Sequence, residues 1–100
     1  MFSGGSYDDV ARWLLNFVIS HAKREHPRIE VVLDARRARE GRSYGVRLSL
    51  DGRLTPTVEL DYSDVAANRG ALAWCAALAR RTREQARALL VADPSHVQAG

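Results

Sequence analysis

The side chains in this sequence with the clearest chemical potential are arginines, which fall into two groups. Fourteen of the 15 basic residues are Arg, and Lys23 is the only lysine. A guanidinium matches phosphate and carboxylate oxygens through paired hydrogen bonds, and the net charge of +3 favours anionic partners. These groups are therefore candidate nucleic-acid-binding residues. The candidates are Arg36, Arg37, Arg39 and Arg42 in one connector, with Arg69, Arg80, Arg83 and Arg87 along the last predicted helix.

Each arginine group also has an ordinary structural explanation. A polar connector is typical of a solvated hairpin loop. The second group shares one sector of a helix, which is equally typical of a solvent face that carries an Arg80–Glu84 pair. The excess of Arg over Lys also fits the codon bias of a GC-rich genome. Each group alone is better explained as solvated surface. The presence of both groups in one chain strengthens the nucleic-acid-binding interpretation, although solvated surface remains the better explanation.

The residues that could catalyse a reaction lack the partners that catalysis needs. Cys75 lies on the apolar stripe of the last predicted helix, where a thiol is usually an inert core residue. The acid pairs Asp8/Asp9 and Asp61/Asp64 lie at predicted helix starts, where negative charge stabilises the helix dipole. The sequence contains no nucleophile-elbow or phosphate-loop motif. We expect no enzyme activity, no catalytic residue, no cofactor and no small-molecule substrate.

Metal ligands are equally sparse in the sequence. The histidines are His21, His26 and His96, and the spacing of the first two points them in divergent directions on a helix. Neither a Cys-x-x-Cys nor a His-Glu-x-x-His pattern is present. His21 lies on an apolar face and is better explained as a half-buried, hydrogen-bonded side chain. We therefore expect no metal site.

Length and composition place the chain among small globular domains. Its 100 residues suffice for one domain, and 46% hydrophobic with 27% charged residues excludes a wholly disordered chain, a collagen or a coiled-coil rod. A single cysteine allows no disulfide within the chain, which fits a reducing compartment. The sequence shows no signal-peptide pattern and no apolar segment of membrane-spanning length. We expect a cytoplasmic protein without a membrane partner.

Hydrophobic periodicity predicts a helix in the first quarter of the chain. Apolar residues follow helical spacing from about Tyr7 to His26. Ser6 is the expected N-cap, with Asp9 three residues later as in a capping box. Pro27 then stops the helix.

Alternation of apolar and polar residues predicts three strands after this helix. They cover about 29–36, 44–50 and 57–62. Asp51-Gly52 is a strong signal for a two-residue hairpin. Pro56 belongs at the start of the third strand or on an edge, because it has no N–H for a ladder.

Helical spacing returns in the last third of the chain. Ser63 begins this region and Asp93-Pro94 ends it. Gly70 is a weak point at which a short leading turn separates from the main helix. The apolar stripe of that helix includes Leu72, Cys75, Leu78, Ala79, Thr82, Ala86, Leu89 and Leu90.

The predicted architecture is α+β in the order α-β-β-β-α. A three-stranded antiparallel meander has two helices packed on one face. The chain forms a single domain over 1–100, with an ordered core at about 6–93 and flexible ends at 1–5 and 95–100. The residues predicted to be mostly buried together are Trp13, Phe17, Val31, Leu33, Val46, Leu48, Val58, Leu60, Leu72 and Cys75.

This order of elements, with an Arg-rich connector between the first two strands, resembles the double-stranded RNA-binding domain. The likeness is one of topology and covers about 7–93. That family reads RNA shape through its first helix, the loop between its first two strands, and a basic run at the start of its second helix. The resemblance implies RNA contact by the connector; in place of the basic run this chain has Ser63-Asp64-Val65-Ala66-Ala67-Asn68-Arg69. The chain also resembles small bacterial α/β proteins that have no assigned activity.

We expect a small, non-enzymatic binding or interaction domain. One candidate function is weak, shape-dependent binding of nucleic acid through the two arginine groups. The alternative is protein–protein association or homo-oligomerisation through a sheet edge or a helix face, because the unpaired groups of an edge strand invite another strand.

Overall fold

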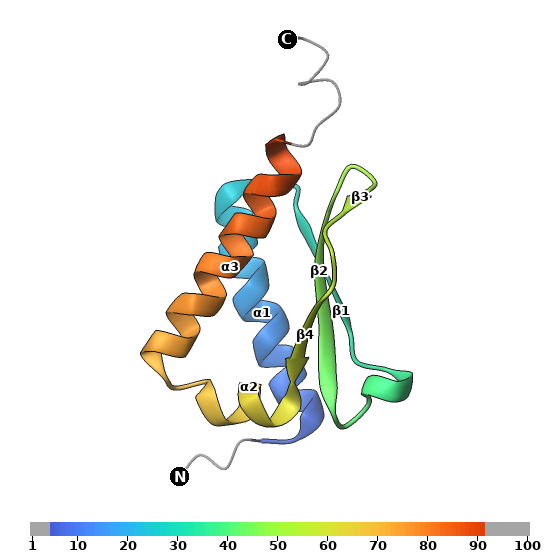
Figure 1. Cartoon of the computed structure of the whole chain (residues 1–100), viewed down its shortest axis with the longest axis vertical. Helices are drawn as coiled ribbons and strands as arrows, with labels where there is room; N and C mark the ends of the chain where they lie inside the picture. Colours follow the sequence, from blue (N-terminus) through green and yellow to red (C-terminus); the bar gives the residue numbers. More distant parts are fainter. Residues whose placement is uncertain (1–4, 92–100) are drawn as a thin grey trace.

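The elements predicted from the sequence are present, and they follow one another along the chain as expected (Figure 1). A computed structural model describes residues 5–91. The predicted flexible ends, apart from Gly5, and the predicted stop at Asp93-Pro94 lie outside these residues. The elements are α1 (Tyr7–Glu25), β1 (Glu30–Asp34), the 3-10 helix η1 (Arg37–Arg39), β2 (Ser43–Leu50), β3 (Arg53–Leu54), β4 (Val58–Asp61), α2 (Tyr62–Asn68) and α3 (Leu72–Val91).

Helix α1 begins and ends at the predicted signals. The Ser6 side chain accepts a hydrogen bond from the backbone N–H of Asp9 at 3.1 Å, which confirms Ser6 as the N-cap. Acidic residues occupy the first turn and basic residues the last, so both ends complement the helix dipole. His26 is extended, as expected for a residue that precedes a proline, and the helix ends one residue earlier than predicted.

The sheet is an antiparallel meander with β2 at its centre. β1 pairs with one edge of β2, and both β3 and β4 pair with the other edge. Asp51 and Gly52 have φ values of 51° and 83°, the positive values that a tight hairpin turn requires. The predicted meander and hairpin are confirmed.

The third predicted strand, 57–62, corresponds to β4, and a bulge separates β4 from the short strand β3 that precedes it. The prediction is wrong at Tyr62, which begins α2. Ser49 pairs with Leu54 and Val46 pairs with Val58, so the chain from β3 to β4 has one more residue than β2 between these pairs. Thr55 maintains the connection, because its buried hydroxyl oxygen accepts a hydrogen bond from the N–H of Leu48 at 2.9 Å. β4 is therefore a short strand with its own register against β2.

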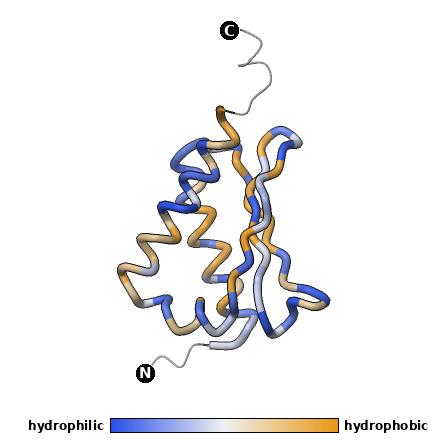
Figure 2. The backbone as a smooth tube through the Cα atoms, viewed as in Figure 1, coloured by the Kyte–Doolittle hydropathy of each residue, from blue (hydrophilic) through white to orange (hydrophobic). Residues whose placement is uncertain are grey.

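The two long helices lie on the same face of the sheet, as predicted (Figure 1). Hydrophobic residues recur along the helices and the strands (Figure 2), and buried residues from both layers form one core cluster. The register places Val31 beside Leu48 and Leu33 beside Val46, so the predicted strand faces are correct. The buried core residues include Val10, Leu14, Val18, Ala22, Ile29, Tyr44, Val46, Leu48, Leu50, Val65, Leu78, Ala79, Ala86 and Leu89.

The predicted core is wrong at Leu72, which is 88% exposed. Leu72 is the first residue of α3, where that helix lies farthest from the sheet (Figure 1). Trp13 and Phe17 are half-buried, because the row of α1 that faces the sheet is Val10, Leu14, Val18 and Ala22. Cys75, in the first turn of α3, is also half-buried. The two aromatic rings stack at 5.1 Å along the flank of α1 and cover the junction with α3.

A cluster of three tyrosines joins the start of α1 to the sheet and to α2. The rings of Tyr7 and Tyr44 stack at 4.7 Å, and Tyr62 packs edge-on against both. Tyr44 is fully buried and donates a hydrogen bond to the carbonyl of Tyr7 at 2.8 Å, while Tyr62 donates to the carbonyl of Gly5 at 2.7 Å. Burial raises the pKa of Tyr44 above its ordinary value. The sequence analysis did not identify this cluster.

The position of Leu48 provides a test of the core. Leu48 is 2% exposed on the central strand and faces the helices. We expect Leu48→Ala to lower the free energy of unfolding by roughly 2–5 kcal/mol, because the substitution leaves a cavity that the core cannot fully close. Urea denaturation measures this change, and a loss of less than about 0.5 kcal/mol would contradict the strand face described here.

Candidate functional site

In the connector, Arg39 is held by two acidic residues from neighbouring strands. Asp34, Gly45 and Glu59 lie in one row across β1, β2 and β4. Arg39 folds across this row, with Nη1 2.7 Å from an oxygen of Asp34 and Nε 3.1 Å from an oxygen of Glu59. A Cβ on Gly45 would lie 2.7 Å from the guanidinium carbon, so the close approach requires glycine. The charge of Arg39 is therefore neutralised within the domain.

The other three arginines of the connector remain at the surface. Arg36, Arg37 and Arg42 are exposed and form no ion pair within the described part of the chain. Their segment includes the 3-10 helix η1, where Arg37 adopts a φ of 59°. The Tyr7 hydroxyl is 2.9 Å from the carbonyl oxygen of Arg39 and donates toward the carbonyls of this segment. The segment is a compact turn anchored to α1.

The second arginine group does not form one continuous helical face. Arg69 is the C-cap of α2, and Gly70 separates it from α3 at the predicted break. Arg69 is half-buried, with its guanidinium beside Gly5. Arg87 forms a two-pronged ion pair with Glu25, with distances of 3.0 and 3.4 Å. Among the members on α3, Arg80 is exposed and Arg83 is half-buried.

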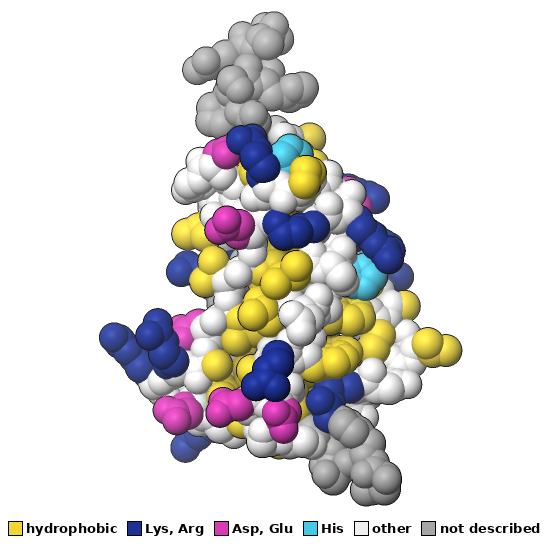
Figure 3. Space-filling view, turned by 180° about the vertical axis from the view of Figure 1, so that it is seen from behind, with side chains coloured by type: hydrophobic (Ala, Val, Ile, Leu, Met, Phe, Trp, Pro, Cys, Tyr) yellow, Lys and Arg dark blue, Asp and Glu magenta, His cyan; other side chains and the backbone are white. Residues whose placement is uncertain are grey.

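The structure does not bring the two arginine groups onto one surface. The connector lies beyond the sheet from α3 (Figure 1). Seen from behind, basic and acidic side chains are interspersed, and hydrophobic side chains occupy the middle of that face (Figure 3). A duplex would therefore meet mixed charge on this face rather than a basic field.

His21 lies beside this second group and is half-buried, as predicted. Its ring packs against Phe17 at 4.6 Å. Its Nδ1 is buried without a hydrogen-bond partner in residues 5–91, which differs from the expected hydrogen bond. Burial, followed by the charges of Arg24 and Arg83, lowers the pKa of His21. The neutral imidazole is therefore favoured.

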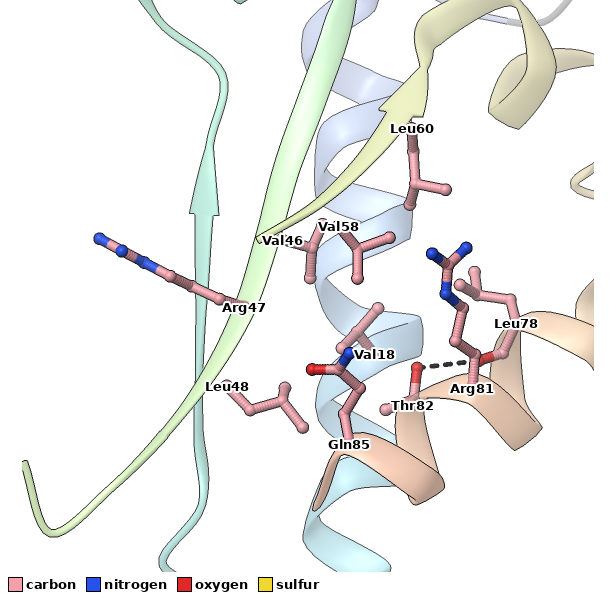
Figure 4. Close-up of a pocket in the computed structure, with 10 residues that line it drawn as sticks. All are labelled: Val18, Val46, Arg47, Leu48, Val58, Leu60, Leu78, Arg81, Thr82 and Gln85. Carbon is pink, nitrogen blue, oxygen red and sulfur yellow. Dashed lines mark hydrogen bonds between the residues drawn. The ribbon is translucent and has the colours of Figure 1, made fainter. Parts of the chain in front are cut away.

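A hollow lies between α3 and the half of the sheet formed by β2 and β4 (Figure 4). The space in it that water can enter is only about 20 Å³, and it adjoins a second, more open hollow of about 130 Å³ toward the start of α3. We call the two together the β4–α3 trough. Its apolar wall consists of Val18, Val46, Leu48, Val58, Leu60 and Leu78 in the first part and of Trp74 and Ala77 in the second.

The trough exists because α3 packs mainly on α1. α3 reaches β2, whereas β4 has little contact with it. Thr82 faces the trough, and its hydroxyl donates to the carbonyl of Leu78 at 2.9 Å, so the polar group is satisfied within the helix. Val58 and Leu60 remain half-buried because no helix covers them fully.

The mouth of the trough carries one positive side chain. Arg81 extends from α3 toward Leu60, and Gln85 follows one turn later (Figure 4). Arg47 also contributes to the lining, but its side chain points away from the trough (Figure 4). No acidic residue lines either hollow in the described residues, and Arg81 has no ion-pair partner among them.

The outer edge of β4 runs along this trough with its backbone unpaired in the described chain. Tyr62 N–H donates to the carbonyl of Arg42 at 2.8 Å, and hydrogen-bonded positions alternate along an antiparallel ladder. Val58 and Leu60 therefore direct their backbone groups toward β2. Glu59 directs both of its backbone groups outward to the free edge, and Asp61 directs its N–H there, whereas the carbonyl of Asp61, the N-cap of α2, accepts the first hydrogen bond of that helix.

The sequence candidates did not include Arg81 or Gln85. A signal was present, because Trp74, Leu78, Arg81 and Gln85 follow helical spacing on a second flank of α3. That flank is not continuously apolar, so hydrophobic periodicity alone did not predict it as a binding surface. Its role depends on the distance between α3 and β4, which no local pattern encodes.

No protein family, curated protein or solved structure matches the chain. Residues 5–91 contain no group of three or more His, Cys, Asp or Glu side chains placed to hold a metal ion. None of the helices within these residues is long and apolar enough to cross a membrane.

The Arg39 ion pairs generate a prediction about pH. The hydrogen bond from Arg39 lowers the pKa of Glu59 below its ordinary value of 4.5, so the pair stabilises the fold while Glu59 is ionised. We expect Arg39→Gln to lower the Tm at pH 7 and the gap from wild type to narrow as the pH falls below about 4. Arg42→Gln is the control, because exposed Arg42 has no such pair. A gap that stays constant between pH 7 and pH 3 would contradict the pairing.

Proposed function

We propose that this protein is a non-enzymatic interaction domain that binds an extended segment of a partner protein as an added strand beside β4. The observation that carries the proposal is the free edge of β4 beside an apolar trough. A strand added to an open edge gains main-chain hydrogen bonds, while pockets for alternate side chains provide specificity. Both elements of this recognition mode are present at the β4–α3 trough.

The dimensions of β4 suit such an addition. Glu59 presents its N–H and carbonyl to the free edge and Asp61 presents its N–H, while Val58 and Leu60 face the trough. An incoming strand about 4.8 Å from β4 would place alternate side chains over the same apolar wall. α3 would then cover the added strand from one side.

The arrangement of charge favours a protein partner over nucleic acid. The topological resemblance to the double-stranded RNA-binding domain implies RNA contact by the connector alone. Arg39 and Arg87 are paired with acids, and Arg69 is half-buried. The connector and α3 also face different directions (Figure 1). These features reduce the positive charge available to phosphates. Binding of a protein segment in the trough requires no rearrangement of these arginines.

Asp61→Pro tests the free edge without disturbing the ladder to β2. Asp61 has a φ of −68°, which proline adopts without strain, and its side chain makes no capping hydrogen bond. The proline removes an outward N–H and places its ring where an added strand must approach. Asp61→Ala is the matched control, because it removes the same carboxylate but keeps the N–H.

The probe is a displayed library of peptides of about nine residues with apolar side chains at alternate positions. We expect peptides enriched on the wild-type protein to bind Asp61→Pro at least about tenfold more weakly and Asp61→Ala almost normally. Fluorescence anisotropy with synthetic peptides measures the affinities, and circular dichroism checks folding. Failure to enrich any sequence, or equal binding by the two variants, would overturn the proposal.

Two further outcomes would assign the domain differently. A concentration-dependent dimer that Asp61→Pro dissociates would assign the β4 edge to a second copy of the chain, and sedimentation equilibrium measures this. Salt-sensitive binding of duplex RNA or DNA that is lost on replacing Arg36, Arg37 and Arg42 by Gln would support the nucleic-acid function instead.

A further inference from the structure

We infer, on the basis of the proposed strand-binding function, that the segment bound in the β4–α3 trough is acidic. It carries two apolar side chains two residues apart and an Asp or Glu whose carboxylate pairs with Arg81. The free edge of β4 alone does not select the side chains of the partner segment. The inference rests on the placement of one guanidinium at the mouth of an otherwise apolar site.

Arg81 is shared by both parts of the trough. Leu60, Leu78 and Arg81 line the first hollow and the second alike, so a segment in either one lies beside the guanidinium. Figure 4 shows the Arg81 side chain extended from α3 toward Leu60 rather than folded onto the helix. Within residues 5–91 no carboxylate pairs with it. The described part of the chain therefore supplies no counterion for Arg81.

Binding would change the surroundings of this charge. An apolar segment in the trough removes water from one side of Arg81, and a guanidinium that loses water without a partner is penalised. A carboxylate from the segment restores that interaction through paired, charge-assisted hydrogen bonds. A lysine at the same position would add like-charge repulsion, so Arg81 selects against basic segments as well as for acidic ones.

The spacing of the apolar side chains follows from β4. Val58 and Leu60 both face the trough, and alternate residues of a strand are about 6.8 Å apart. A strand lying beside β4 presents its own alternate side chains at the same interval, one toward Val46 and the other toward Trp74. Gln85 lies one helical turn beyond Arg81 and offers an amide to the segment's remaining polar groups.

The library described above tests this inference when one trough-facing position is drawn from Asp, Lys and Ser. We expect the wild-type protein to enrich Asp, and a synthetic Asp peptide to bind about tenfold more tightly than its Ser counterpart. Arg81→Glu should reverse the preference toward Lys, and Arg81→Gln should abolish it. Arg80→Glu is the matched control, because Arg80 is exposed on the same helix but does not line the trough.

The experiment distinguishes failure of the acidic-segment inference from failure of the proposed strand addition at β4. If Asp61→Pro still abolishes binding while neither Arg81 variant alters the preferred residue, the acidic partner is overturned and strand addition stands. If no peptide is enriched on the wild-type protein, strand addition itself is overturned. Dodecanoate that binds with the same dependence on Arg81, without any peptide binding, would replace the acidic segment by a small amphiphilic anion.

Discussion

The packing of α1 on the sheet is the interaction on which the rest of the structure depends. Four residues at spacings of four, Val10, Leu14, Val18 and Ala22, are at most 2% exposed. Burial of a Val or Leu side chain stabilises the fold by about 1.5–3 kcal/mol, so the three larger members of this row contribute strongly to the core. α1 packs on β1, and α3 packs mainly on α1 and only partly on the sheet, at β2. The uncovered side of the sheet is the β4–α3 trough.

The bulge at Thr55 and the tyrosine cluster determine how β4 borders that trough. The bulge gives β4 a register that places Val58 and Leu60 on the helix-facing side. At the other end of β4, Tyr62 begins α2 and packs against Tyr7 and Tyr44. The strand is thus held at both ends while its outer backbone stays open. A rigid edge is suited to strand addition because little conformational entropy remains to be lost on binding.

The distribution of charge distinguishes the outer face of the sheet from the trough. On the outer face, Arg39 crosses Gly45 to meet Asp34 and Glu59, so two carboxylates neutralise its positive charge. In the trough, Arg81 faces an apolar wall with no acid beside it in the described chain. A cation that lacks an internal partner is available for recognition, whereas one enclosed by two carboxylates serves the fold. The same residue type therefore has two roles that composition does not separate.

Local patterns in the sequence determined the elements of this protein. Helical spacing predicts α1 and α3, alternation predicts the strands, Asp51-Gly52 predicts the hairpin, and Gly70 predicts the break before α3. These signals depend on residues close together in the chain, so a sequence pattern carries them. Only the tertiary structure decided the partners of Arg39, because its approach over Gly45 requires the register of three strands. It also decided the exposure of Leu72 and the placement of Arg81 at the mouth of the trough. Both depend on how far α3 stands from the sheet, because α3 packs mainly on side chains of α1, more than fifty residues away in the chain.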